Sequence, residues 1–206
     1  NCQYSDFFLK AESNVAVSVG NYQYESRTIV DGELSLTLPN QSRYNNPLLN
    51  LNVIFGKRIS RFGIGVGVGT SILEMAHPFF ADETYKRIYY PVELNVDFDF
   101  VLFKNLEMTT NGSLGYSFLD EKFLKQLNQY HWEFSGGLSG SLFFGIHSFE
   151  FLNWKFVPGI GYMYNEFKTT LNSGYFSRFR LSQEIDKVEY TTRFHSISFG
   201  LIISPD

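Results

Sequence analysis

The stretch YYPVELNVDFDFVLF, residues 89–103, alternates bulky apolar side chains with polar ones. From Tyr90 to Leu102 every second residue is apolar, and the residues between them include Glu93, Asn95, Asp97 and Asp99. Successive side chains of a β-strand point to opposite faces. The stretch therefore predicts a strand with one apolar face and one acidic face.

The same period of two recurs along the chain. It is found in SNVAVSVGNY (13–22), LLNLNVIF (48–55), GIGVGVGTSIL (63–73), LEMTTNGSLGYSF (106–118), YHWEFSGGLSGSLFF (130–144), LNWKFVPGIGYMY (152–164) and HSISFGLII (195–203). With the first stretch these make eight amphipathic segments, each long enough to cross a bilayer as a tilted strand.

The connections between these segments alternate in length. GKRIS, FKN and GIHSFEF are short, and residues 25–47, 74–88, 119–129 and 166–191 are long. This alternation favours an up-and-down meander with its turns at one end and its loops at the other. We therefore predict one domain, residues 1–206, that is a closed eight-stranded antiparallel up-and-down transmembrane β-barrel.

The width of such a barrel decides which face is inside. The interior of an eight-stranded barrel is just wide enough for side chains, so the many Phe, Tyr, Trp and Leu residues belong outside and the Gly, Ser and Asn residues inside. We expect the lipid-facing band to include Val66, Val96, Leu114, Leu138 and Ile160. A soluble lipocalin-like carrier, the alternative, would turn the apolar set inward.

The composition narrows the choice of partners. The formal net charge is −4 and 18% of the residues are charged, which argues against nucleic acid. His77, Asp82 and Glu83 have no spacing typical of a metal site, and we predict neither metal nor cofactor.

Two stretches carry a family resemblance. IYYPVELNVDF (88–98) and FGIGVGVG (62–69) resemble the PorT-like outer-membrane barrels of Bacteroidota, within the wider class of small OmpA/OmpX-type barrels. The resemblance implies a bacterial outer-membrane location and a barrel fold. It does not imply one activity, because loops and partners set function on such folds.

Charged residues on the polar faces predict a network inside the lumen. Its members are Glu93, Asp97, Asp99, Glu107, Glu133 and Lys155. We expect Lys155 to face the carboxylates at one depth, and Lys10 and Glu12 to join them at the rim. Tyr22, Phe143, Met163 and Phe194 share the inward phase. The network is either a salt-bridge plug or a path for cations or protons, because buried charges persist only when paired.

The long loops carry the candidate partner-binding residues. These are Phe79, Phe80, Tyr175, Phe176, Arg178, Phe179 and Arg180. Aromatic residues with Arg suit a protein interface or the phosphates of lipopolysaccharide.

The function we expect is that of a non-enzymatic structural or accessory barrel that binds another envelope protein and contacts outer-membrane lipid. Its termini would be periplasmic and its long loops extracellular. The alternative is a lipid A-modifying enzyme that uses His147–Ser148 or His195–Ser196, with Glu184 or Glu189 approaching His195 from the last long loop.

Overall fold

The computed structural model describes residues 5–18, 22–30, 33–42, 47–76, 84–103, 106–119, 132–172 and 185–205. Its strands are β1 (Ser5–Ser18), β2 (Tyr22–Val30), β3 (Glu33–Ser42), β4 (Pro47–Ile59), β5 (Phe62–Ala76), β6 (Thr84–Phe103), β7 (Leu106–Leu119), β8 (Trp132–Ser135), β9 (Gly137–Ile146), β10 (Phe149–Phe151), β11 (Trp154–Asn172) and β12 (Ile185–Pro205). Within these ranges, no helix is long and apolar enough to cross a membrane.

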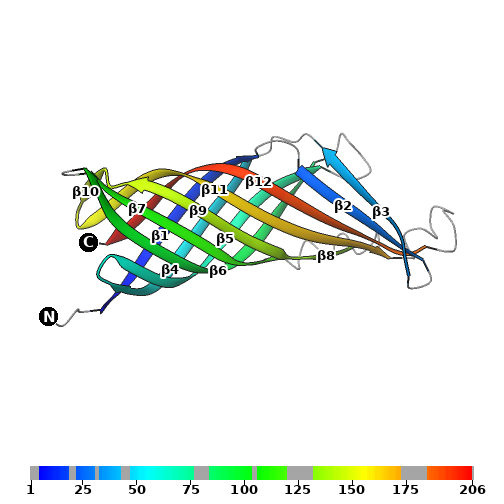
Figure 1. Cartoon of the computed structure of the whole chain (residues 1–206), viewed down its shortest axis with the longest axis horizontal. Helices are drawn as coiled ribbons and strands as arrows, with labels where there is room; N and C mark the ends of the chain where they lie inside the picture. Colours follow the sequence, from blue (N-terminus) through cyan, green and yellow to red (C-terminus); the bar gives the residue numbers. More distant parts are fainter. Residues whose placement is uncertain are drawn as a thin grey trace.

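Eight of the strands close into an antiparallel barrel, which confirms the predicted fold (Figure 1). The order around the wall is β1–β4–β5–β6–β7–β9–β11–β12, and β12 returns to β1. The closing seam pairs residues 11–18 with residues 196–203. β1 begins and β12 ends at the end of the barrel that carries the short hairpins, called the turn end below. The opposite end is called the loop end.

Two elements extend the wall at the loop end. β8 continues β9 across Gly136 and pairs with β11. β2 and β3 form a hairpin, and β2 pairs with the first half of β12. Residues 25–47, expected to be a connection only, therefore contain most of this hairpin, because β12 is 21 residues long and offers an edge beyond the barrel.

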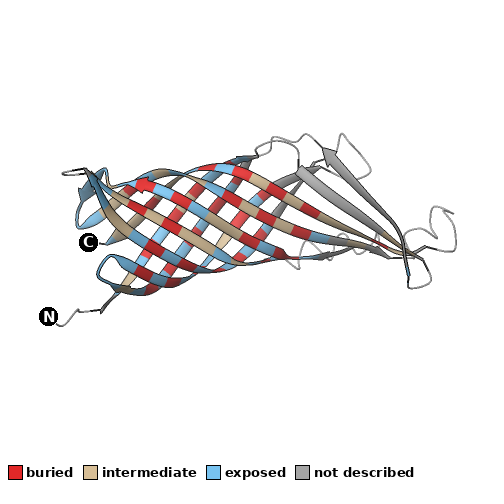
Figure 2. Cartoon of the chain, viewed as in Figure 1, coloured by how far each residue is buried: buried red, intermediate tan, exposed pale blue. Residues whose placement is uncertain are grey.

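Burial alternates along the barrel strands, as Figure 2 shows by colour. The five residues expected in the lipid-facing band, Val66, Val96, Leu114, Leu138 and Ile160, have exposed fractions between 37% and 68%. Polar side chains of the opposite phase, such as Asn50, Asn95 and Ser139, face inward and are buried. The apolar set therefore faces outward, as predicted, which is the opposite of a soluble carrier barrel.

Apolar side chains close the lumen near the loop end. A cluster of Ala16, Leu48, Leu73, Tyr89, Met163, Phe167 and Phe194, contributed by six strands, packs across it. The Tyr89 and Phe167 rings stack with centroids 3.9 Å apart. A smaller cluster of Phe143, Val157 and Ile202 fills another part of the interior. Phe143, Met163 and Phe194 thus point inward as expected, whereas the side chain of Tyr22 lies outside the described residues.

Candidate functional site

The turn-end half of the lumen contains a buried ion pair between Lys10 of β1 and Asp97 of β6. Both side chains are at least 97% buried, since 3% and 1% of their areas are exposed. β4 and β5 lie between these two strands in the wall. Gly63 of β5 makes room for the pair: a Cβ at that position would lie 3.0 Å from Asp97 Oδ2. The glycine row of β5 therefore leaves room for polar side chains of neighbouring strands to lie over its inner face.

Asp97 is the hub of the network. Its Oδ1 accepts hydrogen bonds from Lys10 Nζ and Asn111 Nδ2. Arg58 Nη2 lies 3.4 Å from Asp97 Oδ2, and Arg58 Nη1 lies 2.8 Å from Asp99 Oδ2. Residues of β1, β4, β6 and β7 are thus connected through one carboxylate. A buried anion with this many donors is well compensated.

The network continues from Asp99 to the mouth of the turn end. Thr109 Oγ1 donates to Asp99 Oδ1 at 2.6 Å and lies 2.7 Å from His147 Nε2. His147 Nδ1 is 3.3 Å from Glu107 Oε2, and the Glu107 side chain is 60% exposed. The chain of contacts therefore runs from the dry interior to solvent.

Two further buried carboxylates, Glu12 and Glu93, take no part in the ion pairs of the described residues. Glu12 accepts a hydrogen bond from Asn14 Nδ2, and Asn52 Nδ2 lies 3.5 Å from Glu93 Oε2. Both glutamates are about 95% buried. The hydrogen-bond partners of these two glutamates are neutral amides and not cations.

The structure locates the predicted site residues as follows. Glu93, Asp97 and Asp99 face the lumen, and Glu107 lies at its mouth. Lys155 does not join the Asp97 cluster: its Nζ lies 4.0 Å from Glu150 Oε1 in the β10–β11 hairpin. The side chain of Glu133 lies outside the described residues, as do Phe79, Phe80, Tyr175, Phe176, Arg178, Phe179 and Arg180.

Lys10 and Glu12 correct the sequence analysis. Both were expected at the rim before the first strand, but β1 begins at Ser5 and holds them deep in the lumen. Arg58 was missed altogether, although it follows the inward phase of Asn50 and Asn52 along β4. A signal for Lys10 and Glu12 was present in the sequence, because both share the inward phase of Asn14 and Ala16 along β1, but the adjacent Phe7 and Phe8 obscured it.

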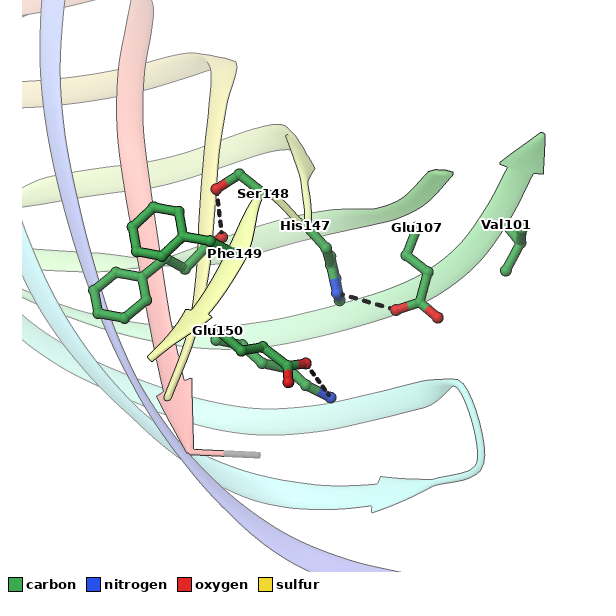
Figure 3. A pocket seen from close by; sticks show the side chains of 8 residues that line it. Val101, Glu107, His147, Ser148, Phe149 and Glu150 are labelled. Atoms are coloured by element: carbon green, nitrogen blue, oxygen red, sulfur yellow. Dashed lines mark hydrogen bonds and ion pairs between the residues drawn. The ribbon is translucent and has the colours of Figure 1, made fainter. Parts of the chain in front are cut away.

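A pocket of about 400 Å³ opens at the turn end (Figure 3). Its lining residues are Val101, Glu107, His147, Ser148, Phe149, Glu150, Lys155 and Phe156. The Phe149 and Phe156 rings stack at 4.6 Å and form its apolar wall. Ser148 Oγ donates to the carbonyl oxygen of Phe156 at 3.0 Å.

Among the described residues the histidine–serine pairs do not have the geometry of a nucleophilic site, and Glu184 lies outside those residues. His195 is partly exposed beside Tyr162 and Tyr164 on the outer face, whereas Ser196 is buried and faces inward. His147 contacts Thr109, but the Thr109 hydroxyl is buried and its proton is directed to Asp99. A nucleophile needs an exposed hydroxyl whose proton goes to the base. In the described part of the chain, no three His, Cys, Asp or Glu residues converge as metal ligands.

Comparisons with known proteins bear on the fold. No family model and no curated protein matches the sequence. The outer-membrane protein OprG from Pseudomonas aeruginosa is similar in structure, with a TM-score of 0.52 and 14% identity over 98% of this chain and 96% of that one. Neisserial surface protein A has a TM-score of 0.45 and 9% identity over 97% of each chain. The outer-membrane protease OmpT from Escherichia coli has a TM-score of 0.46 and 8% identity over 95% of this chain and 96% of that one. The chain therefore has the fold of a small outer-membrane β-barrel.

Proposed function

We propose that this chain is a non-conducting, non-enzymatic barrel of the bacterial outer membrane that serves as a structural or accessory subunit for another envelope protein. The observation that carries the proposal is that buried side chains pack and hydrogen-bond across the lumen. The apolar cluster of the loop end lies above a hydrogen-bonded polar network, and both draw on side chains from several strands. Because these side chains occupy the lumen, the surfaces outside it are the ones available to bind another protein.

The outer surface supports the membrane location. Apolar side chains such as Val66, Leu94 and Leu114 are more than half exposed and belong in hydrocarbon. The closed sheet pairs its backbone groups internally, which a bilayer requires. In the proposed orientation the turn end is periplasmic and the loop end extracellular, because short turns are typical of the periplasmic side. The likeness of residues 62–69 and 88–98 to PorT-like barrels of Bacteroidota supports the same assignment.

The test is the mass of the particle extracted from native outer membranes in mild detergent. A tagged copy of the full chain would be purified and its protein mass measured by size-exclusion chromatography with light scattering. We expect a stoichiometric second protein in addition to the 23.8 kDa of this chain. A control barrel of similar size, tagged in the same way, should elute alone. A lone 23.8 kDa species before and after chemical cross-linking would contradict the proposal.

The lipid-modifying enzyme is tested separately. Lipid A from a strain that lacks this protein would be compared with wild-type lipid A by mass spectrometry. The proposal expects identical spectra. The loss of an acyl chain or of another substituent, restored by the unmodified gene, would establish the enzyme instead.

A further inference from the structure

The strand β10 leaves one side of the sheet open at the turn end. In the described residues β10 pairs with β11 alone and stands first in the strand order. The pairing of β7 with β9 ends at Met108 and Ile146, and one further hydrogen bond runs from the His147 N–H to the Glu107 carbonyl oxygen at 3.0 Å. β10 therefore continues past the last rung of its neighbour. Such an unpaired edge is a template for an added strand.

The hairpin geometry shows which backbone groups are available. β10 and β11 are joined by Leu152 and Asn153, with φ values of 52° and 64°, as a two-residue type I′ turn requires. Phe151 and Trp154 flank the turn and are partners, and the pair next to such a turn exchanges both hydrogen bonds. The N–H and C=O of Glu150 therefore point away from β11.

The pocket of Figure 3 lies beside this edge, and its lining includes two carboxylates together with Lys155 and His147. The side chains of Glu107 and Glu150 are 60% and 61% exposed. Among the described residues Glu107 lies 3.3 Å from His147 and Glu150 lies 4.0 Å from Lys155, and both contacts leave carboxylate oxygens accessible. Carboxylates so placed favour a guanidinium or ammonium group. The stacked Phe149 and Phe156 rings offer its aliphatic stem an apolar wall.

We propose that an extended segment of the partner protein adds to the free edge of β10 and inserts an Arg or Lys side chain between Glu107 and Glu150. Main-chain hydrogen bonds to Glu150 would give affinity, and the acidic pocket would give specificity, as in other cases of strand addition. This inference rests on the proposed accessory function and names the docking surface and the chemistry of the bound segment.

The probe is a fluorescein-labelled peptide, acetyl-Thr-Val-Arg-Val-Thr-amide, and binding is followed by fluorescence anisotropy with the full protein in detergent micelles. Glu150→Pro removes both the N–H that the added strand needs and the Glu150 carboxylate, without removing a hydrogen bond to β11, and the double variant below removes the carboxylates alone. We expect that variant to bind at least about tenfold more weakly. Glu107→Gln with Glu150→Gln should weaken binding about tenfold and flatten its salt dependence, because charge-assisted bonds are lost.

The controls separate strand addition from adhesion to micelles. Glu33→Gln removes an exposed carboxylate of β3, and it should bind like the unmodified protein. A peptide with Glu in place of Arg, and one with N-methylated valines, should not bind. Unchanged binding in Glu150→Pro and in the double glutamine variant, or no binding of the Arg peptide at all, would overturn the inference.

The failure of this inference is distinguishable from the failure of the proposed function. If the native complex forms with unmodified protein and equally with Glu150→Pro, the accessory function stands and the docking surface is wrong. If unmodified protein forms no complex, the accessory function itself fails. If the unmodified protein forms the complex and Glu150→Pro does not, although circular dichroism shows that this variant is folded, the accessory function and the docking surface are both supported.

Discussion

Replacement of Lys10 by methionine tests the lumen network most directly. The change keeps most of the length of the side chain and removes its charge, so Asp97 loses its closest cationic partner. The Asp97 side chain is only 1% exposed, so solvent water cannot hydrate its carboxylate in place of the lost ammonium group. An anion left without its partner in the interior is strongly destabilising.

The magnitude follows from the partners that remain. Breaking a buried pair costs about 3–5 kcal/mol. Arg58 remains 3.4 Å from Asp97 Oδ2, and Asn111 still donates to Oδ1. We therefore expect Lys10→Met to lower the free energy of unfolding by about 3 kcal/mol, the lower end of that range.

Lys155→Met is the matched control. Lys155 is 30% exposed and its ion-pair partner Glu150 is 61% exposed, so this change should cost at most about 1 kcal/mol. A second variant, Lys10→Met with Asp97→Asn, removes both charges and should recover at least half of the lost stability, because no anion remains stranded.

The assay is equilibrium unfolding in guanidinium chloride of barrels folded into phospholipid vesicles, followed by tryptophan fluorescence. If Lys10→Met unfolds at the same midpoint as the unmodified protein, or if Lys155→Met is the less stable of the two, the assignment of Lys10 and Asp97 as the hub is wrong.

Four other expectations concern the wall, the lumen and the orientation. Val96→Arg should cost about 2–4 kcal/mol in lipid because it puts a charge in hydrocarbon, and unchanged vesicle unfolding would contradict this. Gly115→Ala should destabilise by about 1–3 kcal/mol, since its Cβ would lie 2.0 Å from a backbone oxygen of β6, whereas the Cβ of Gly112→Ala meets its nearest atom at 4.0 Å and should be tolerated in the same unfolding assay. Planar bilayers with the unmodified protein should show no steady current, and regular single-channel steps would mean an aqueous lumen. In a cysteine-free background, an impermeant thiol reagent on whole cells should label Glu33→Cys and spare Ser60→Cys, and the reverse pattern would invert the orientation.

The period of two in the sequence was sufficient to predict the barrel. Strand alternation needs only local pattern, and the narrow lumen of an eight-stranded barrel decides which face is inside. The glycines at 63, 65, 67 and 69 were also informative, because they mark where neighbouring side chains such as Asp97 and Asn95 lie over β5.

The ion-pair partners inside the lumen could not be predicted from the alternation of residues along each strand. Lys155 was expected opposite Asp97 because both lie on the polar face toward the turn end. The structure pairs Asp97 with Lys10 instead, across β4 and β5. Strand tilt and stagger shift side chains around the lumen, and a chain position does not give that shift. The extra residue at His147 and Ser148 also changes the phase, so that Glu150 rather than Phe149 lies opposite Lys155.

The seam between β1 and β12 sets the order in which this protein can form. The first described strand has to pair with the last, and the β2–β3 hairpin gains its neighbour from the same final segment. Until β12 is in place, β1 and β11 are open edges, which hydrocarbon does not tolerate. Pairing of such distant segments is intrinsically slow. We therefore expect the barrel to enter the bilayer only after β12 has paired with β1. The rate of this pairing then sets the rate of insertion.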